Sequence, residues 1–198
     1  MPRVTALRER SGRVWIELDG VPWRVLPTEV VVRAGLASGA ELDRAAARTL
    51  ARERRRHEGL GVASRALRTR DLSSRRLSDL LARRRIAPAT SSAVLATLHR
   101  AGIVDDGRFA GSRTRALAER NLGDAAIRSA LEREGLDRDL VEAELAKLAP
   151  ESERAGGIAA SRGRTPSCAR YLLRKGFSEE SIETALGEIA HGGVGELE

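Results

Sequence analysis

Cysteine, lysine and aromatic residues are scarce in this sequence, and the scarcity excludes several kinds of site. The 198 residues include one cysteine, two lysines and five aromatic side chains. A single cysteine, Cys168, cannot form an internal disulfide, and the three histidines lie far apart in sequence, which argues against a zinc site. We therefore expect neither a metal nor another cofactor.

Long apolar runs are also absent. Charged residues make up 32% of the chain, and no apolar run approaches the ~20 residues that a membrane-spanning helix needs. Residues 1–5 lack the apolar centre of a secretion signal. These features predict a cytoplasmic protein without a membrane partner, and the 41% apolar content is enough for a packed core.

Positive charge is concentrated in the first two-thirds of the chain. The formal net charge is +7, and 33 of the 35 basic residues are arginine. Residues 1–60 contain 12 arginines against 8 acidic residues, and residues 61–120 contain 13 against 5. Residues 121–198 reverse the balance, with 10 basic and 15 acidic residues. A GC-rich genome raises arginine content generally, but the separation by sign favours a polyanion for one part and a protein surface for the other.

A β-hairpin is predicted near the N-terminus. Apolar residues alternate over 14–18, and Asp19-Gly20 suits a two-residue type I′ turn. Pro22 has no N–H to donate, so we expect its strand at the edge of a sheet. A regular register pairs three apolar residues of each strand on one face: Leu18 with Val21, Ile16 with Trp23, and Val14 with Val25.

Helices dominate after the hairpin. Thr28 is a candidate N-cap for a short helix over 29–35, although three consecutive valines make a strand nearly as favourable there. A helix rich in alanine, arginine and leucine is predicted over about 42–56, and Gly59 and Gly61 are expected to end it. Further helices are predicted over about 62–70, 106–119 and 152–161.

An internal repeat is the most informative pattern. Three segments share six positions separated by 4, 5, 5, 4 and 3 residues, and only Ser91 among them is polar. This spacing fits a helix, a short turn and a second helix. The positions are Leu77, Leu81, Ile86, Ser91, Leu95 and Leu98; Ile127, Leu131, Leu136, Val141, Leu145 and Leu148; Cys168, Leu172, Phe177, Ile182, Leu186 and Ile189.

The predicted turns carry matching residues. Gly135 and Gly176 occupy the position after the first helix, and Asp137 and Ser178 are suited to cap the second. Arg85 stands at the glycine position of the first copy, so we expect a different turn there. Cys168 takes an apolar position and is expected to be a small buried side chain.

The predicted fold is mainly α, with three tandem three-helix repeats in an elongated array after a small N-terminal β-hairpin and helix leader. The expected divisions are 1–48 for the leader, 49–104, 105–149 and 150–191 for the repeats, and 192–198 for a flexible tail.

Catalytic motifs are missing. The glycine-rich stretches do not continue into Lys-Ser or Lys-Thr, which excludes a P-loop. Asp105-Asp106 is the one suggestive carboxylate pair, and it is better explained as the start of a helix. We expect a protein that is not an enzyme.

Arginines of residues 52–120 form the candidate binding surface. As a group they are predicted to form a discontinuous track for phosphates, whereas any single one is more simply a solvated or ion-paired side chain. Residues 24–108 contain no aromatic side chain, so base stacking is poorly supported and contacts are expected to be electrostatic. The candidates are Arg54, Arg55, Arg56, Arg65, Arg68, Arg75, Arg76, Arg83, Arg84, Arg113, Arg115 and Arg120.

Residues 101–110, AGIVDDGRFA, resemble the signature of the RecX regulatory proteins, in which Gly-apolar-apolar-Asp-Asp-x-x-Phe-Ala joins two repeats. The segments LEREGL (131–136) and LLRKGF (172–177) are similar to the repeated turns of that family. The likeness covers about residues 60–190. Arg85 departs from the family's glycine, which affects the contacts expected of the first repeat. Asp105, Asp106 and Phe109 are interpreted as structural, a helix start and a core anchor.

The resemblance implies a regulator that binds the filament of RecA recombinase on single-stranded DNA and inhibits its ATPase and strand-exchange activities or caps its growth. Single-stranded DNA is therefore an expected partner, with double-stranded DNA as a second candidate, and we expect the protein to be a monomer. Two alternatives stay open from the residues themselves. One is a sequence-nonspecific DNA-binding helical-repeat protein without a recombinase partner, and the other is a helical adaptor without affinity for nucleic acid.

Overall fold

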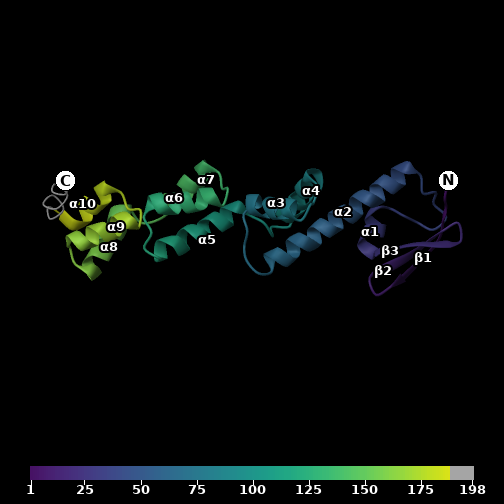
Figure 1. Cartoon of the computed structure of the whole chain (residues 1–198), viewed down its shortest axis with the longest axis horizontal. Helices are drawn as coiled ribbons and strands as arrows, with labels where there is room; N and C mark the ends of the chain where they lie inside the picture. Colours follow the sequence, from purple (N-terminus) through teal and green to yellow (C-terminus); the bar gives the residue numbers. More distant parts are fainter. Residues whose placement is uncertain (188–198) are drawn as a thin grey trace. The chain divides into compact units, whose positions relative to one another are not determined.

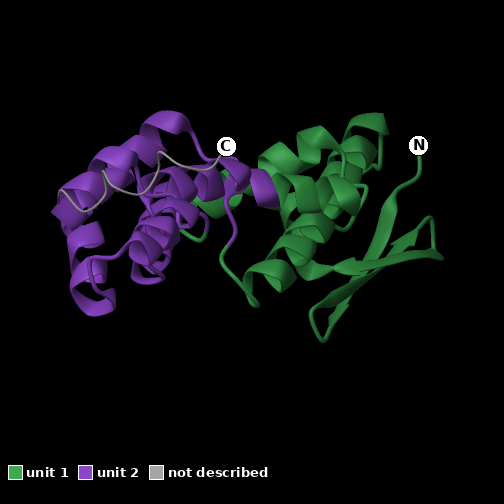
Figure 2. Cartoon of the chain, turned by 60° about the vertical axis from the view of Figure 1, so that its left-hand side comes forward, with its two compact units in different colours: residues 1–71, 77–103 green, residues 72–76, 104–198 purple. Residues whose placement is uncertain are grey.

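The computed structural model describes residues 1–187, so the predicted tail 192–198 and Ile189 lie outside the described residues. Within residues 1–187, three N-terminal strands are followed by ten helices, and Figure 1 shows their order along the chain. The predicted fold class, mainly α with a small β leader, is confirmed. The chain forms two compact units (Figure 2): residues 1–71 and 77–103, and residues 72–76 together with the chain from residue 104 onward.

The leader is a three-stranded antiparallel sheet rather than a hairpin alone. Its strands, β1 (Val4–Arg10), β2 (Arg13–Leu18) and β3 (Val21–Pro27), lie in the order β1-β2-β3, which confirms the edge position of β3. The sequence did not predict β1. A register shift between Val4 and Ala6 interrupts its pairing with β2 and hides the alternation that identifies a strand.

The register of β2 with β3 differs from the regular one after the turn. Leu18 pairs with Val21 as predicted, but a bulge makes Trp23 an extra residue, so that Ile16 faces Arg24. The predicted pairs Ile16–Trp23 and Val14–Val25 are therefore wrong. The bulge shifts the later part of β3 by one residue, and Leu26 is buried in place of Val25.

The short segment after the sheet is a helix, α1 (Thr28–Arg33), which buries Val30 and Val31. Pro27 precedes the helix without a side-chain cap, so the predicted capping by Thr28 is wrong. The Thr28 hydroxyl instead donates to Glu9 at 3.0 Å. These valines complete the core that Val14, Ile16 and Leu26 form under the sheet.

A single helix, α2 (Arg44–Leu67), replaces the two helices predicted on either side of Gly59 and Gly61. The predicted break at these glycines is wrong. Gly59 lies against α4 (Pro88–Arg100), where an added Cβ would be 2.9 Å from Cγ2 of Val94. The glycine thus permits close packing of two helices, and tertiary contacts outweigh its low helix propensity. Between them the chain forms α3 (Ser74–Arg83).

The turn between α3 and α4 has the conformation of the glycine turns. Arg85 has φ of 60°, against 77° for Gly135 and 83° for Gly176. The backbone N–H of Ile86 donates to Leu81 at 3.0 Å, as the residue after each glycine does to its own helix. The different turn expected at Arg85 is thus wrong, and an arginine is held in the left-handed region.

Replacing Arg85 with glycine is expected to stabilise the protein by about 0.5–1 kcal/mol. The strain of a side chain at positive φ is removed, and the greater freedom of glycine in the unfolded chain offsets part of that gain. Urea unfolding measures the difference. Arg85→Ala, which removes the charge and keeps the strain, should stay near the wild type; equal gains from both variants would show that charge and not φ is responsible.

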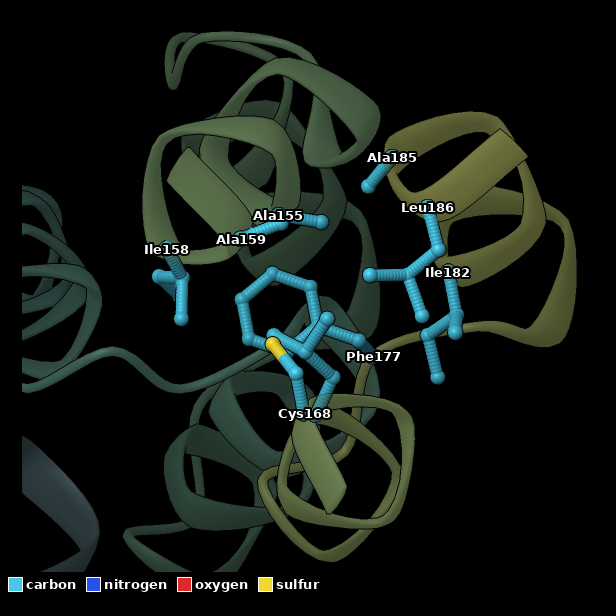
Figure 3. Packing of buried hydrophobic residues seen from close by; sticks show 9 residues of the cluster. Ala155, Ile158, Ala159, Cys168, Phe177, Ile182, Ala185 and Leu186 are labelled. Carbon is cyan, nitrogen blue, oxygen red and sulfur yellow. The ribbon is translucent and has the colours of Figure 1, made fainter. Parts of the chain in front are cut away.

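The second unit contains two bundles of three helices. The first consists of α5 (Asp106–Glu119), α6 (Asp124–Arg133) and α7 (Arg138–Leu145), packed around Ile127, Leu131 and Val141. The second consists of α8 (Glu151–Arg162), α9 (Pro166–Arg174) and α10 (Glu179–Leu186). Figure 3 shows its core, in which Phe177 lies beside Cys168. The predicted burial of Cys168 and the caps by Asp137 and Ser178 are confirmed.

Candidate nucleic-acid interface

Helix α2 carries a large excess of arginine, and its two acidic residues are already paired. Glu53 contacts Arg52 at 3.6 Å and Arg56 at 3.5 Å, and Glu58 contacts Arg54 at 3.4 Å. Within residues 1–187, the remaining arginines of the helix form no ion pair, and they are exposed. These are Arg44, Arg48, Arg55 and Arg65, and Arg68 follows them at the exposed C-cap.

Four arginines of α2, including the ion-paired Arg52, form a stripe that the sequence pattern only partly revealed. Arg44, Arg48, Arg52 and Arg55 are separated by 4, 4 and 3 residues, and a helix of about 3.6 residues per turn brings such positions to one side. Arg44 and Arg48 were missed as candidates. Their spacing was the available signal, but it becomes meaningful only on a helix that begins at residue 44.

Arg56 has a different environment from its neighbours. Its side chain is only 20% exposed, and it donates to the Thr97 hydroxyl in α4 at 2.8 Å while pairing with Glu53. Arg56 therefore joins α2 to α4. The exposed arginines of α2 are Arg44, Arg48, Arg52, Arg55 and Arg65.

Helix α3 separates its arginines into two pairs. Arg83 and Arg84 are exposed near its end, in the first unit. At its start, Arg76 pairs with Glu134 at 2.8 Å, and Arg75 packs on Gly135, whose missing Cβ would lie 2.4 Å from Cγ of Arg75. Arg75 and Arg76 thus contact the turn between α6 and α7 within the second unit.

Helix α5 presents Arg113 and Arg115, and Arg120 is its C-cap. All three are exposed and form no ion pair within the described part of the chain. The candidates therefore divide between the units. Arg54, Arg55, Arg56, Arg65, Arg68, Arg83 and Arg84 belong to the first; Arg75, Arg76, Arg113, Arg115 and Arg120 belong to the second.

The signature residues lie at the start of α5. The Asp105 carboxylate accepts from the backbone N–H of Arg108 at 3.0 Å and caps the helix. Asp106 accepts from the backbone N–H of Ser74, the first residue of α3, at 2.8 Å. Phe109 is half-buried and packs on the α5–α7 core.

The contact made by Asp106 recurs one repeat later. Glu151, the first residue of α8, accepts from the backbone N–H of Asp124, the first residue of α6, at 2.6 Å. The turns show the same recurrence. The Ser73 hydroxyl donates to the Glu134 carbonyl at 2.6 Å, and the Gly123 backbone N–H donates to the Lys175 carbonyl at 2.9 Å.

Glu151 and Asp124 have shifted pKa values at this junction. Burial raises the pKa of Glu151, but hydrogen bonds from Ser178 and from the backbone of Asp124 outweigh it and hold the pKa below the ordinary 4.5. Burial raises the pKa of Asp124 above the ordinary 3.8, although Arg154 opposes the shift. Arg154 pairs with Asp124 and donates to the Leu122 carbonyl at 2.9 Å.

Glu151→Gln is expected to destabilise the protein at pH 7 by about 1–2 kcal/mol, because the charged acceptor of three hydrogen bonds is lost. A carboxylate with a lowered pKa stabilises the fold above its unfolded pKa, and this contribution disappears as the pH falls through the folded pKa. The difference between variant and wild type should therefore shrink below about pH 4.5. Urea unfolding at several pH values measures it. Glu153→Gln, on the exposed side of the same helix, should change little at any pH; a pH-independent loss in Glu151→Gln would contradict the assignment.

Curated proteins of known family resemble this chain in sequence. "Regulatory protein RecX" of Deinococcus radiodurans is 32% identical over 164 residues, which cover 78% of this chain and 79% of that protein. The chain belongs to the RecX family. A second RecX protein, from Halorhodospira halophila, is 32% identical over 134 residues, covering 63% of this chain and 83% of its own. No model of a known protein family matches the chain.

Solved RecX structures share the fold. One crystal structure of regulatory protein RecX superposes with a TM-score of 0.79 at 21% identity, covering 93% of this chain and 98% of its own. The crystal structure of RecX from Lactobacillus salivarius has a TM-score of 0.60 at 20% identity, covering 68% and 96%. The resemblance drawn from residues 101–110 and the repeated turns is confirmed at the level of the RecX family.

Two further features are missing from the described residues of this RecX-family chain. None of their helices has the length and apolar character needed to span a bilayer. No three histidine, cysteine or acidic side chains within residues 1–187 come together as metal ligands.

Proposed function

We propose that this RecX-family protein binds the RecA filament on single-stranded DNA and lowers its ATPase and strand-exchange activities. It acts as a cytoplasmic, non-enzymatic monomer in this proposal. The observation that carries it is the exposed arginine face of α2, whose acidic residues are used within the helix and leave Arg48, Arg55 and Arg65 available for phosphates.

The charge distribution supports a partner made of both DNA and protein. Residues 61–120 contain 13 arginines against 5 acidic residues, whereas residues 121–198 contain 15 acidic residues against 10 basic ones. A protein that only coats DNA gains nothing from an acidic part, because like charges repel. A regulator that contacts phosphates as well as basic protein surfaces uses both its basic segment and its acidic segment.

RecA assembled on single-stranded DNA provides the test. Adding the purified protein is expected to slow ATP hydrolysis and shorten the filaments seen by electron microscopy. Unchanged hydrolysis and filament length at concentrations that saturate binding would overturn the proposal. Steeply salt-dependent binding to bare DNA without any effect on filaments would favour the alternative, a sequence-nonspecific DNA-binding protein with no recombinase partner.

A further inference from the structure

The outer face of the N-terminal sheet exposes both tryptophans of the chain. Trp15 is 42% exposed and Trp23 is 37% exposed, although large aromatic side chains are usually buried. They lie outside the range 24–108 in which aromatic residues are missing. Neither indole belongs to the core under the sheet, which consists of Val14, Ile16, Leu26 and the residues packed on them.

The strand register places Trp15 in a row that crosses the sheet. Arg8 of β1 and Val25 of β3 lie directly opposite Trp15 on either side, and opposite residues of antiparallel strands share a face. Two residues further along, Arg10 lies opposite Arg13 on that same face. The sheet thus presents an exposed indole with arginines beside it.

Little acidic charge neutralises this face. Glu17 contacts Arg8 at 3.5 Å, but the Arg8 side chain remains 75% exposed. Arg10 and Arg13 are exposed and form no ion pair within residues 1–187. Trp23, the extra residue of the bulge, has the Arg24 guanidinium over its ring at 5.2 Å from the centroid. Positive charge therefore accompanies both indoles.

We propose that this face, defined by Arg8, Arg10, Arg13, Trp15 and Trp23, binds single-stranded nucleic acid by stacking bases on the indoles and pairing phosphates with the arginines. An antiparallel sheet that exposes aromatic rings beside arginines suits unpaired bases, since each base has a face that stacks. The arginine rows interrupt the apolar surface beside Trp15 and Val25, which disfavours a purely apolar protein partner. The site needs no recombinase and is separate from the α2 face.

Tryptophan emission reports directly on this site, because both tryptophans of the full chain lie on the sheet. Titration with an oligothymidylate of about 15 nucleotides is expected to quench the emission. An abasic oligonucleotide of equal length carries the same phosphates without bases and should quench far less. Trp15→Ala should weaken oligothymidylate binding about tenfold, and Trp15→Phe should restore most of the affinity. Val32→Ala, at an exposed apolar residue of α1, is the matched control and should bind normally.

Several outcomes would overturn the proposal. Emission that stays constant while a labelled oligothymidylate becomes fully bound would place the nucleic acid elsewhere. Equal quenching by the abasic oligonucleotide would show a purely electrostatic contact. Quenching by RecA in the absence of DNA, with none by oligothymidylate, would make the sheet a protein-docking surface. The titration of the wild-type protein tests the sheet proposal even if Trp15→Ala fails to fold. A negative titration would overturn the sheet proposal alone, because the ATPase test of the proposed function is independent of it.

Discussion

Changing Arg48, Arg55 and Arg65 together to glutamate is expected to weaken binding to single-stranded DNA, bare or coated with RecA, by about 50-fold at 0.15 M salt. Each phosphate contact contributes roughly 0.7 to the slope of log affinity against log salt concentration, so three lost contacts remove about 2 from it. All three arginines are exposed and free of ion pairs within the described residues, and glutamate suits a helix as well as arginine does. Fluorescence anisotropy across a range of salt concentrations measures both the affinity and the slope.

A second triple variant separates this surface from net charge. Arg138, Arg164 and Arg170 are exposed arginines of the second unit, and changing them to glutamate alters the charge by the same amount. This control is expected to lose only a few-fold in affinity, through long-range repulsion. If both triple variants lose affinity equally and both keep the salt slope of the wild-type protein, the α2 face is not where phosphates bind.

The sequence did not reveal which arginines are free to bind phosphates and which are paired within the fold. Arg56 and Arg76 looked like surface cations, but one reaches Thr97 and the other reaches Glu134, residues 41 and 58 positions away. Such partners are set by tertiary packing, and no local pattern reveals them. Composition correctly located the excess of arginine, while the assignment of individual arginines needed the fold.

Local patterns predicted most of the helical part for a clear physical reason. Helix starts such as Asp137 and Ser178 and turns such as Gly135 depend on residues within a few positions, so their chemistry is visible in sequence. The continuity of α2 is different. Gly59 looks like a helix breaker until Val94, 35 residues later, is seen to occupy the space above it.

The strands were harder to predict because their pattern is interrupted. The bulge at Trp23 shifts the register by one residue, and a one-residue shift exchanges the two faces of a strand. The regular register placed Val25 on the same face as Val14 and Ile16, but Val25 is exposed and Leu26 is buried opposite Val14. The same shift leaves Trp15 opposite Val25 on the outer face, a pairing that the regular register does not contain.

Gly123→Ala is expected to destabilise the second unit by about 3 kcal/mol or more. An added Cβ would lie 2.3 Å from the backbone of Gly176 and Phe177, and backbone cannot move aside as a flexible side chain can. The collision also separates the Gly123 N–H from the Lys175 carbonyl. Urea unfolding followed by circular dichroism measures the loss. Gly157→Ala in α8, where the new Cβ meets no atom within 4 Å, is the matched control and should stabilise by about 0.5–1 kcal/mol.

Backbone conformation does not account for the glycine at this position. Gly123 has φ of −79° and ψ of 168°, which any residue adopts, and it is the N-cap of α6. Alanine is a poor N-cap whereas serine is a good one, so Gly123→Ser distinguishes a lost cap from a collision. A collision predicts that the serine variant is destabilised about as much as the alanine variant. Recovery to wild-type stability in Gly123→Ser would show that capping explains the loss, and the close approach of these two turns would then not be what requires glycine.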